Sequence, residues 1–155
     1  MYDQPNVEYL DKELIDAIKE KQQEDMAFLK IENGTQPKKV VDKIRNAVDD
    51  LLSENHSKEI LQEYALQLGV VWGCMVAERY GWSWQYLDFG ENNKGIFLVS
   101  PQSFYCCPPL YFMDKVLLGN NKGLDGANDN TVLLLFNMID GIENQKPPQK
   151  YQIIY

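Results

Sequence analysis

Apolar residues recur at the spacing of an α-helix through the first half of the chain. The first predicted helix runs from Asp11 to about Ile31, and its apolar residues Leu10, Leu14 and Ile18 recur every four positions. A second predicted helix begins at residue 37, where proline suits the first helical turn, and its apolar residues follow the helical period with few errors. Each helix therefore has one face that must be buried.

A third predicted helix begins after Ser57, which suits an N-cap, and ends at Tyr80, before Gly81. Apolar residues lie on most of its sides, which is typical of a central helix that is mostly buried. We therefore expect the other elements to pack around this helix.

A strip of small residues runs along the third helix at a spacing of four, formed by Ala65, Gly69, Gly73 and Ala77. A glycine in a helix interior costs about 1 kcal/mol relative to alanine, so close approach of another backbone is the favoured explanation. Another helix or a sheet packed on the strip fits best. A homodimer seam and a ligand crevice remain alternatives.

After Gly81 the pattern changes to the alternation of a β-strand, with Trp82, Trp84 and Tyr86 on one face. Turn residues at 90–95 and a second apolar strand at 96–100 predict a hairpin. The aromatic face either contributes to the core or forms an exposed recognition surface, because Trp and Tyr are enriched in interface hot spots.

The last third of the chain mixes short elements. Pro109 opens a short helix, residues 120–130 form a polar loop, and a helix that is apolar nearly all round begins at about Thr131. Residues 151–155 could add a terminal strand to the sheet of the hairpin. The last helix is expected in the core.

Helices first and strands later predict an α+β fold, with N-terminal helices packed on a small antiparallel sheet and an apolar C-terminal helix. The chain has 155 residues, enough for one domain and too few for two of ordinary size. We therefore expect a single domain over residues 1–155, helical over 9–80 and mixed over 81–155.

The net charge of −8 disfavours a nucleic acid or an anionic membrane surface as a partner. Most of the negative charge lies in residues 1–63, with net −6, and Glu20, Glu24 and Asp25 are candidate partner-binding residues there. The acidic helices are either a solvated face or a docking surface for a basic protein.

The chain carries few groups for catalysis. Its one histidine, His56, would have to serve any Cys–His pair with Cys106 or Cys107, and the spacing does not show that they meet. Zinc motifs and phosphate-binding loops are absent, and the loop at 125–130 lacks EF-hand spacing. We expect no metal and no cofactor.

The location expected from the sequence is the cytoplasm. Three cysteines, Cys74, Cys106 and Cys107, form no disulfide framework, which fits a reducing compartment. The first residues lack the pattern of a signal peptide, and the longest apolar run, Val132 to Phe136, is far shorter than a membrane span.

The run LGVVWGCMVAERYGWSWQY, followed by IFLVSP and FMDKVL, resembles a loosely defined group of small bacterial α+β domains with no assigned reaction. The resemblance covers about residues 61–118 and leaves the first 60 residues outside. It implies a fold but no catalytic residue. The residues that carry it are Gly69, Gly73, Trp82, Trp84, Pro101 and Lys115. In size, acidity and cytoplasmic character the chain also looks like the immunity proteins of bacterial toxin systems.

The leading hypothesis is a non-enzymatic cytoplasmic protein-binding module, in its most concrete version an immunity protein that neutralises a toxin. The acidic residues would speed the encounter with a basic partner, and Trp84 and Tyr86 would form the centre of the interface. One alternative is a small hydrolase that uses Cys106 or Cys107 with His56. Another is a structural homodimer built on the strip of small residues.

Overall fold

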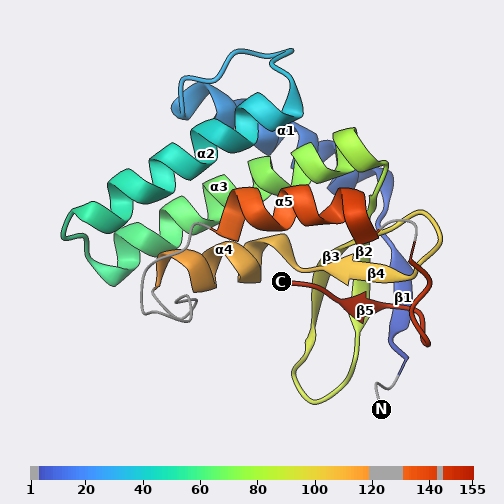
Figure 1. Ribbon diagram of the computed structural model, residues 1–155. Coiled ribbons are helices and arrows are strands. Elements are labelled where there is room, and N and C mark those ends of the chain that lie inside the picture. The colour runs from blue at the N-terminus through green and yellow to red at the C-terminus, as the bar shows by residue number, and fades with distance from the viewer. Residues whose placement is uncertain (1–3, 119–130, 143–144) are drawn as a thin grey trace.

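The computed structural model describes residues 4–118, 131–142 and 145–155, and Figure 1 shows its elements. Helices and strands both occur in these residues, in the order β1 (Asn6–Tyr9), α1 (Lys12–Phe28), α2 (Pro37–Ser53), α3 (Lys58–Tyr80), β2 (Ser83–Asp88), β3 (Lys94–Val99), β4 (Tyr105–Cys107), α4 (Pro109–Leu117), α5 (Thr131–Ile142) and β5 (Gln152–Ile153). The polar loop predicted at 120–130, with its candidate calcium ligands, lies outside the described residues.

The fold is α+β, as predicted, with the apolar C-terminal helix in place as α5. The helices gather on one side of the molecule and the strands on the other (Figure 1). The sheet has the order β1-β2-β3-β4-β5. Every neighbouring pair is antiparallel except β4 and β5, which run parallel. The small sheet is thus antiparallel except at its β5 edge, which makes it a mixed sheet.

Helix ends follow the capping residues of the sequence. The Asp11 carboxylate accepts a hydrogen bond of 2.8 Å from the Leu14 N–H at the start of α1. The Ser57 hydroxyl does the same for the Ile60 N–H at 3.3 Å. Gly81 ends α3 in the left-handed conformation, with φ 75°, which glycine adopts without steric cost. The predicted start of α3 is confirmed to within one residue.

The helix α3 is the centre of the fold. Trp72, fully buried on it, donates from its indole Nε1 to the Val132 carbonyl of α5 at 3.1 Å. Further along the same helix, the Tyr80 hydroxyl donates to the Phe136 carbonyl at 2.8 Å. Both aromatic side chains therefore bury their rings and satisfy their polar atoms, and they fix α5 against α3.

Both faces of the sheet contain buried residues, whereas the alternation of aromatic residues in the sequence predicts only one such face. Leu98 and Cys107 belong to the main core on the helical side. A second, smaller cluster lies on the opposite face and consists of Leu87, Phe97, Val99 and Cys106. Adjacent side chains of a strand point to opposite faces, so Cys106 and Cys107 enter different clusters.

Three features of the fold were not expected. The short strands β1 and β4 were missed, because four and three residues are too few to show alternation. The helix α5 is not buried all round, since Leu134 and Met138 are about half exposed (56% and 49%). The pattern alone could not show which side of such an apolar helix faces water.

By length and composition alone, α3 is long and apolar enough to cross a membrane. Its apolar window has a mean hydropathy of 1.3, and 56% of it is buried inside the protein. The buried core helix of a soluble protein meets the same criterion, so the feature is weak support for a membrane span.

Candidate functional site

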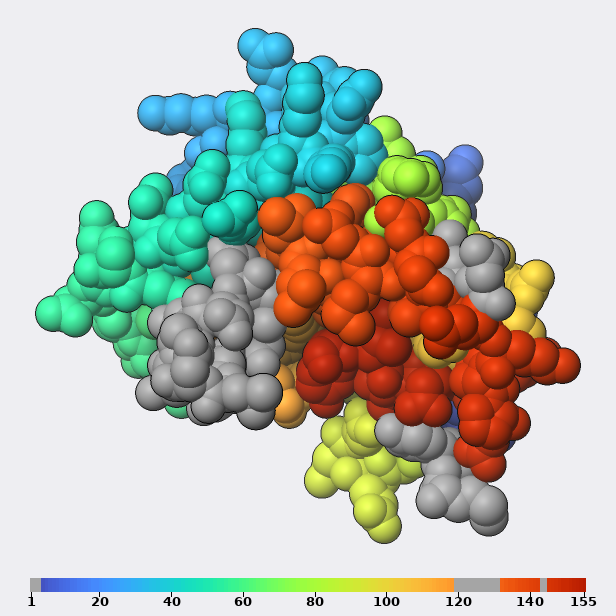
Figure 2. All heavy atoms as spheres, in the orientation of Figure 1, coloured from blue at the N-terminus to red at the C-terminus, as the bar shows by residue number. Residues whose placement is uncertain are grey.

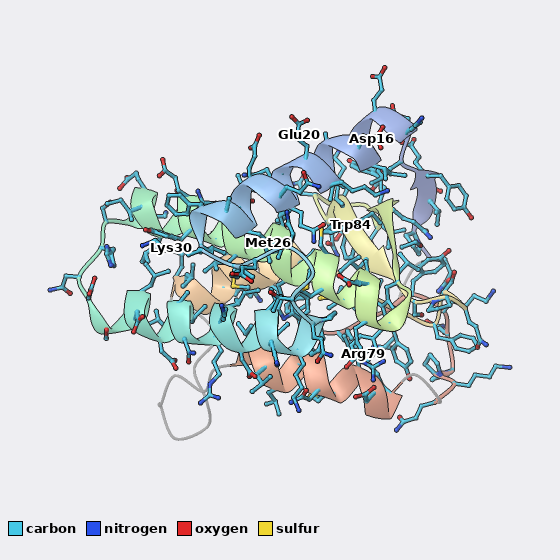
Figure 3. All side chains as sticks on the ribbon, turned by 90° about the horizontal axis from the view of Figure 1, so that it is seen from above. Asp16, Glu20, Met26, Lys30, Arg79 and Trp84 are labelled. Atoms are coloured by element: carbon cyan, nitrogen blue, oxygen red, sulfur yellow. The ribbon has the colours of Figure 1, made fainter. Side chains whose placement is uncertain are left out.

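One side of α1 carries a continuous row of carboxylates. Glu13, Asp16, Glu20 and Glu24 are spaced by three, four and four residues, so they lie on one face of the helix. All four are exposed, and Asp16 and Glu20 lie on the side of α1 that faces away from the rest of the molecule (Figure 3). Within the described parts of the chain none of them forms an ion pair. We call this row the acidic face.

Glu20 and Glu24 are predicted from the sequence as partner-binding residues, whereas Glu13 and Asp16 are not. Their spacing in the sequence could have identified them, because all four residues share one helical face. Asp25, the third residue named, is misassigned. It is only 3% exposed and its Oδ1 accepts a hydrogen bond from the Lys21 ammonium at 3.0 Å. A partner docking on the surface of α1 therefore does not reach Asp25.

A groove lies on the inner side of α1, opposite the acidic face, and Trp84 is one of its lining residues. It has a volume of about 290 Å³ and lies between α1 and α3, where Figure 3 shows Trp84. Apolar side chains form most of it, with charged or polar groups at Lys19, Gln22 and Glu78. The other lining residues are Ile15, Ile18, Cys74, Ala77 and Trp84. The groove thus combines an apolar lining that includes Trp84 with one basic and one acidic side chain, Lys19 and Glu78.

Trp84 is half-buried and packs on the core, whereas Trp82, the first residue of the aromatic pattern, is 3% exposed. Tyr86 is also half-buried, and it lies opposite the exposed Glu8 of β1 in the sheet register. The structure therefore brings Trp84 to the groove, while Tyr86 is not among the groove residues. Trp84 therefore serves partly as core, whereas Tyr86 is not among the residues packed against either buried cluster.

The strip of small residues on α3 is covered within the same chain. A Cβ on Gly69 would lie 3.1 Å from the Pro109 carbonyl oxygen, and a Cβ on Gly73 would lie 2.5 Å from the ring of Trp84. The start of α4 and the aromatic strand thus use the space that the missing side chains leave. A second copy of the chain could reach Gly69 and Gly73 only by displacing these residues.

The cysteines and the histidine do not form a catalytic pair. His56 lies in the turn between α2 and α3, at the opposite end of the helical layer from β4 with its cysteines (Figure 1). Its Nε2 lies 3.1 Å from Oε2 of Glu54. Cys106 and Cys107 are fully buried. The Cys–His hydrolase alternative therefore lacks its assembled site.

Burial also keeps the thiols protonated. It raises the pKa of Cys106 to about 12, and it raises the pKa of Cys107 well above the ordinary value. Burial, followed by the nearby charges of Asp25 and Glu78, raises the pKa of Cys74 to about 12. Among the residues that the structure describes, no group of three or more His, Cys, Asp or Glu side chains could hold a metal ion.

Comparisons of the chain with protein-family models, with curated proteins and with solved structures found no match.

Proposed function

We propose that this protein is a non-enzymatic protein-binding module that docks a basic partner on the acidic face of α1. The observation that carries the proposal is the row of four exposed carboxylates without an ion pair among the described residues. Carboxylates arranged in this way attract a cationic surface from a distance and raise the rate of encounter.

The groove on the inner side of α1 offers the same partner a second contact, which an extended segment of the partner would have to reach around the helix. Exposed charge pairs contribute little to affinity, and the binding energy of interfaces comes mostly from a few side chains buried in pockets. A groove of about 290 Å³ accepts one or two side chains, and the Trp84 ring offers an apolar surface for the stem of an Arg or Lys. Glu78 stands at the same groove to pair with the cationic end.

The most concrete version is an immunity protein of the bacterial cytoplasm that neutralises a basic toxin. Net charge −8 suits a basic partner, and the chain offers no assembled catalytic pair in the part that the structure describes. The mechanism is then steric: the module occupies a functional surface of its target by charge attraction and shape. The homodimer alternative is less favoured, because residues of the same chain cover the glycines of the strip.

Affinity capture with three forms of the full chain tests the proposal. The first is the wild type, and the second carries Asp16→Lys, Glu20→Lys and Glu24→Lys on the acidic face. The third is a control with the same change in net charge at exposed residues elsewhere, made by Glu32→Lys, Asp50→Lys and Glu63→Lys.

We expect one stoichiometric basic protein to be retained from lysate of the producing cells by the wild type and the control, and to be lost from the acidic-face variant. Raised salt should release it from the wild type. Equal retention by all three forms would contradict the proposed docking face, and the absence of any stoichiometric partner would contradict the protein-binding function.

A further inference from the structure

The sheet contains a gap one strand wide beside β3. The strand β4 pairs only with Leu98 and Val99 of β3, and the chain then leaves the sheet at Pro108 to begin α4. On its other side, β3 continues to pair with β2 as far as Lys94. Among the residues that the structure describes, the first half of β3, from Lys94 to Phe97, therefore has no neighbouring strand where β4 would have continued.

The hydrogen-bond alternation of antiparallel strands shows which backbone groups face this gap. The Phe89 N–H donates to the Asn93 carbonyl at 2.9 Å, so every second residue from Asn93, namely Gly95 and Phe97, bonds to β2. The residues between them, Lys94 and Ile96, direct their N–H and C=O groups away from β2. In the described part of the chain nothing bonds to these groups.

The opposite wall of the gap is β5. In the parallel pair of β4 and β5, the Ile154 N–H donates to the Cys106 carbonyl at 2.9 Å. The next donor to β5 in this ladder would be residue 108, which is a proline and has no N–H. Pro108 therefore ends the pairing with β5, while Pro109, which would stand opposite Ile96 in the register of β3 and β4, also lacks an N–H and begins α4.

The gap is a real cavity and has the width of a strand. Its volume is about 510 Å³, and it is lined by residues 92–97 of the hairpin, by Pro108, Leu110 and Tyr111 at α4, and by Ile153 and Tyr155. Strands two positions apart in a sheet are separated by roughly 10 Å, the space that one extended chain fills. Figure 2 shows the hairpin projecting from the body beside the C-terminal segment, so the gap opens at the surface.

The side chains at the gap add positive charge to an otherwise acidic molecule. The Lys115 ammonium lies 4.9 Å from the ring centroids of both Tyr111 and Tyr155, and the two rings meet edge to face at 5.7 Å. Lys94 is exposed at the hairpin end of the gap. Its cross-strand neighbour Asp88 accepts a hydrogen bond from the Gly90 N–H at 2.8 Å.

We infer that this gap binds an extended peptide segment of a partner protein, which adds to the sheet as a strand on the free edge of β3. The backbone groups of Lys94 and Ile96 would pair with the peptide backbone, as in other cases of strand addition. Lys94 and Lys115 select an acidic side chain in the segment, and the Tyr111 and Tyr155 rings select an apolar one. The gap and the acidic face consist of different residues, so this inference does not depend on the function proposed above.

A selection of random dodecapeptides displayed on phage, performed on the full chain, supplies the probe. The enriched peptide is then synthesised, and its affinity is measured by isothermal titration calorimetry. Two further peptides carry N-methyl groups on alternate residues. One is methylated at the odd-numbered residues and the other at the even-numbered residues, and we call these the two phases of methylation. Because this probe changes the peptide, the protein remains intact.

We expect one phase of N-methylation to weaken binding at least about tenfold, since it removes hydrogen bonds to the edge of β3, while the other phase changes it little. Lys94→Glu should weaken binding several-fold, and the matched control Lys150→Glu, outside the gap, should not. The amide protons of Lys94 and Ile96 should become protected from exchange when the peptide binds.

Failure to enrich any peptide would overturn the inference. Equal effects of the two methylation phases would also overturn it, because side-chain contacts alone would then account for binding. If Lys94→Glu does not change the affinity and the Ile96 amide proton stays unprotected from exchange, the peptide binds elsewhere on the protein. A gap that binds small anions such as phenyl phosphate, but no peptide, would indicate a small-molecule site instead.

Discussion

The ring of Trp84 lies against Gly73, so close that a Cβ on this glycine would come within 2.5 Å of the ring. One contact thus joins the central helix to the aromatic strand, and it explains why α3 carries a glycine where alanine would favour the helix. The same contact holds the Trp84 ring in position in the lining of the groove.

Gly73→Ala should therefore destabilise the protein by about 1–3 kcal/mol, because the added methyl group meets the ring of Trp84. The matched control is Gly141→Ala in α5, where a Cβ meets nothing within 4 Å. That change should be neutral or slightly stabilising. Urea unfolding of both variants measures the difference, and an unchanged midpoint for Gly73→Ala would contradict the packing of Trp84 on α3.

The buried carboxylate of Asp25 should depend on Lys21. Its Oδ1 lies 3.0 Å from the lysine Nζ, while its Oδ2 has no hydrogen-bond partner among the described residues. Lys21→Met should cost about 1–2 kcal/mol, a moderate value because the lysine is partly exposed to solvent. Adding Asp25→Asn should recover part of the loss, and Lys19→Met is the surface control. Additive effects of the two changes would show that the pair is not coupled.

The three thiols should resist modification in the folded protein. The pKa values of Cys74 and Cys106 are raised to about 12, so almost no thiolate forms at neutral pH. A disulfide reagent should react slowly with the native chain and fully after unfolding. Rapid modification of one thiol in the native state would contradict its burial and would identify an accessible, reactive cysteine.

Stability should also fall in alkaline solution. In the unfolded chain a cysteine thiol has its ordinary pKa of 9.0, whereas burial raises the pKa of Cys74 to about 12 in the folded chain. Between these values the folded state retains the proton that the unfolded state has lost, so the free energy of unfolding decreases as pH rises. The contribution of Cys74 is complete below the unfolded pKa and is lost progressively toward the folded value.

Cys74→Ala should make this alkaline loss shallower, by up to about 1.4 kcal/mol per pH unit. Urea unfolding of wild type and variant at several pH values within that window measures the two slopes. Identical slopes would mean that Cys74 ionises alike in the folded and unfolded chains.

The free edge of β3 should be detectable by hydrogen exchange in the protein without a ligand. Amide protons of Gly95 and Phe97 bond to β2 and should exchange slowly, while that of Ile96 should exchange faster although its side chain is half-buried. Hydrogen exchange followed by NMR resolves these residues. Uniform protection along β3 would show that another group covers the edge.

How far the sequence predicts the structure depends on the length of each pattern. The helices α2 and α3 have long periodic runs with capping residues, and their starts and ends could be located closely. The terminal strand predicted at 151–155 forms as β5, but its parallel pairing with the three-residue β4 is long-range, and no local pattern reveals it. The hairpin of β2 and β3 lies between these cases, since its turn residues were readable but its second buried face was not.

The candidate sites were likewise predicted only in part from the sequence. The charges of Glu20 and Glu24 were evident, but helical spacing had to be combined with exposure to complete the acidic face and to remove Asp25 from it. The gap beside β3 has no motif at all. It exists because β4 stops at two consecutive prolines, Pro108 facing β5 and Pro109 facing β3, and only the sheet register reveals this consequence.

The most direct test of the central claim is the association rate of the captured basic partner with the wild type and with the triple variant Asp16→Lys, Glu20→Lys and Glu24→Lys, measured across a range of salt concentrations. Docking on the acidic face predicts that the variant associates at least about tenfold more slowly at low salt and loses the salt dependence of the wild type. The triple control at Glu32, Asp50 and Glu63 should retain most of the wild-type rate. Equal rates and equal salt dependence for wild type and acidic-face variant would contradict the account.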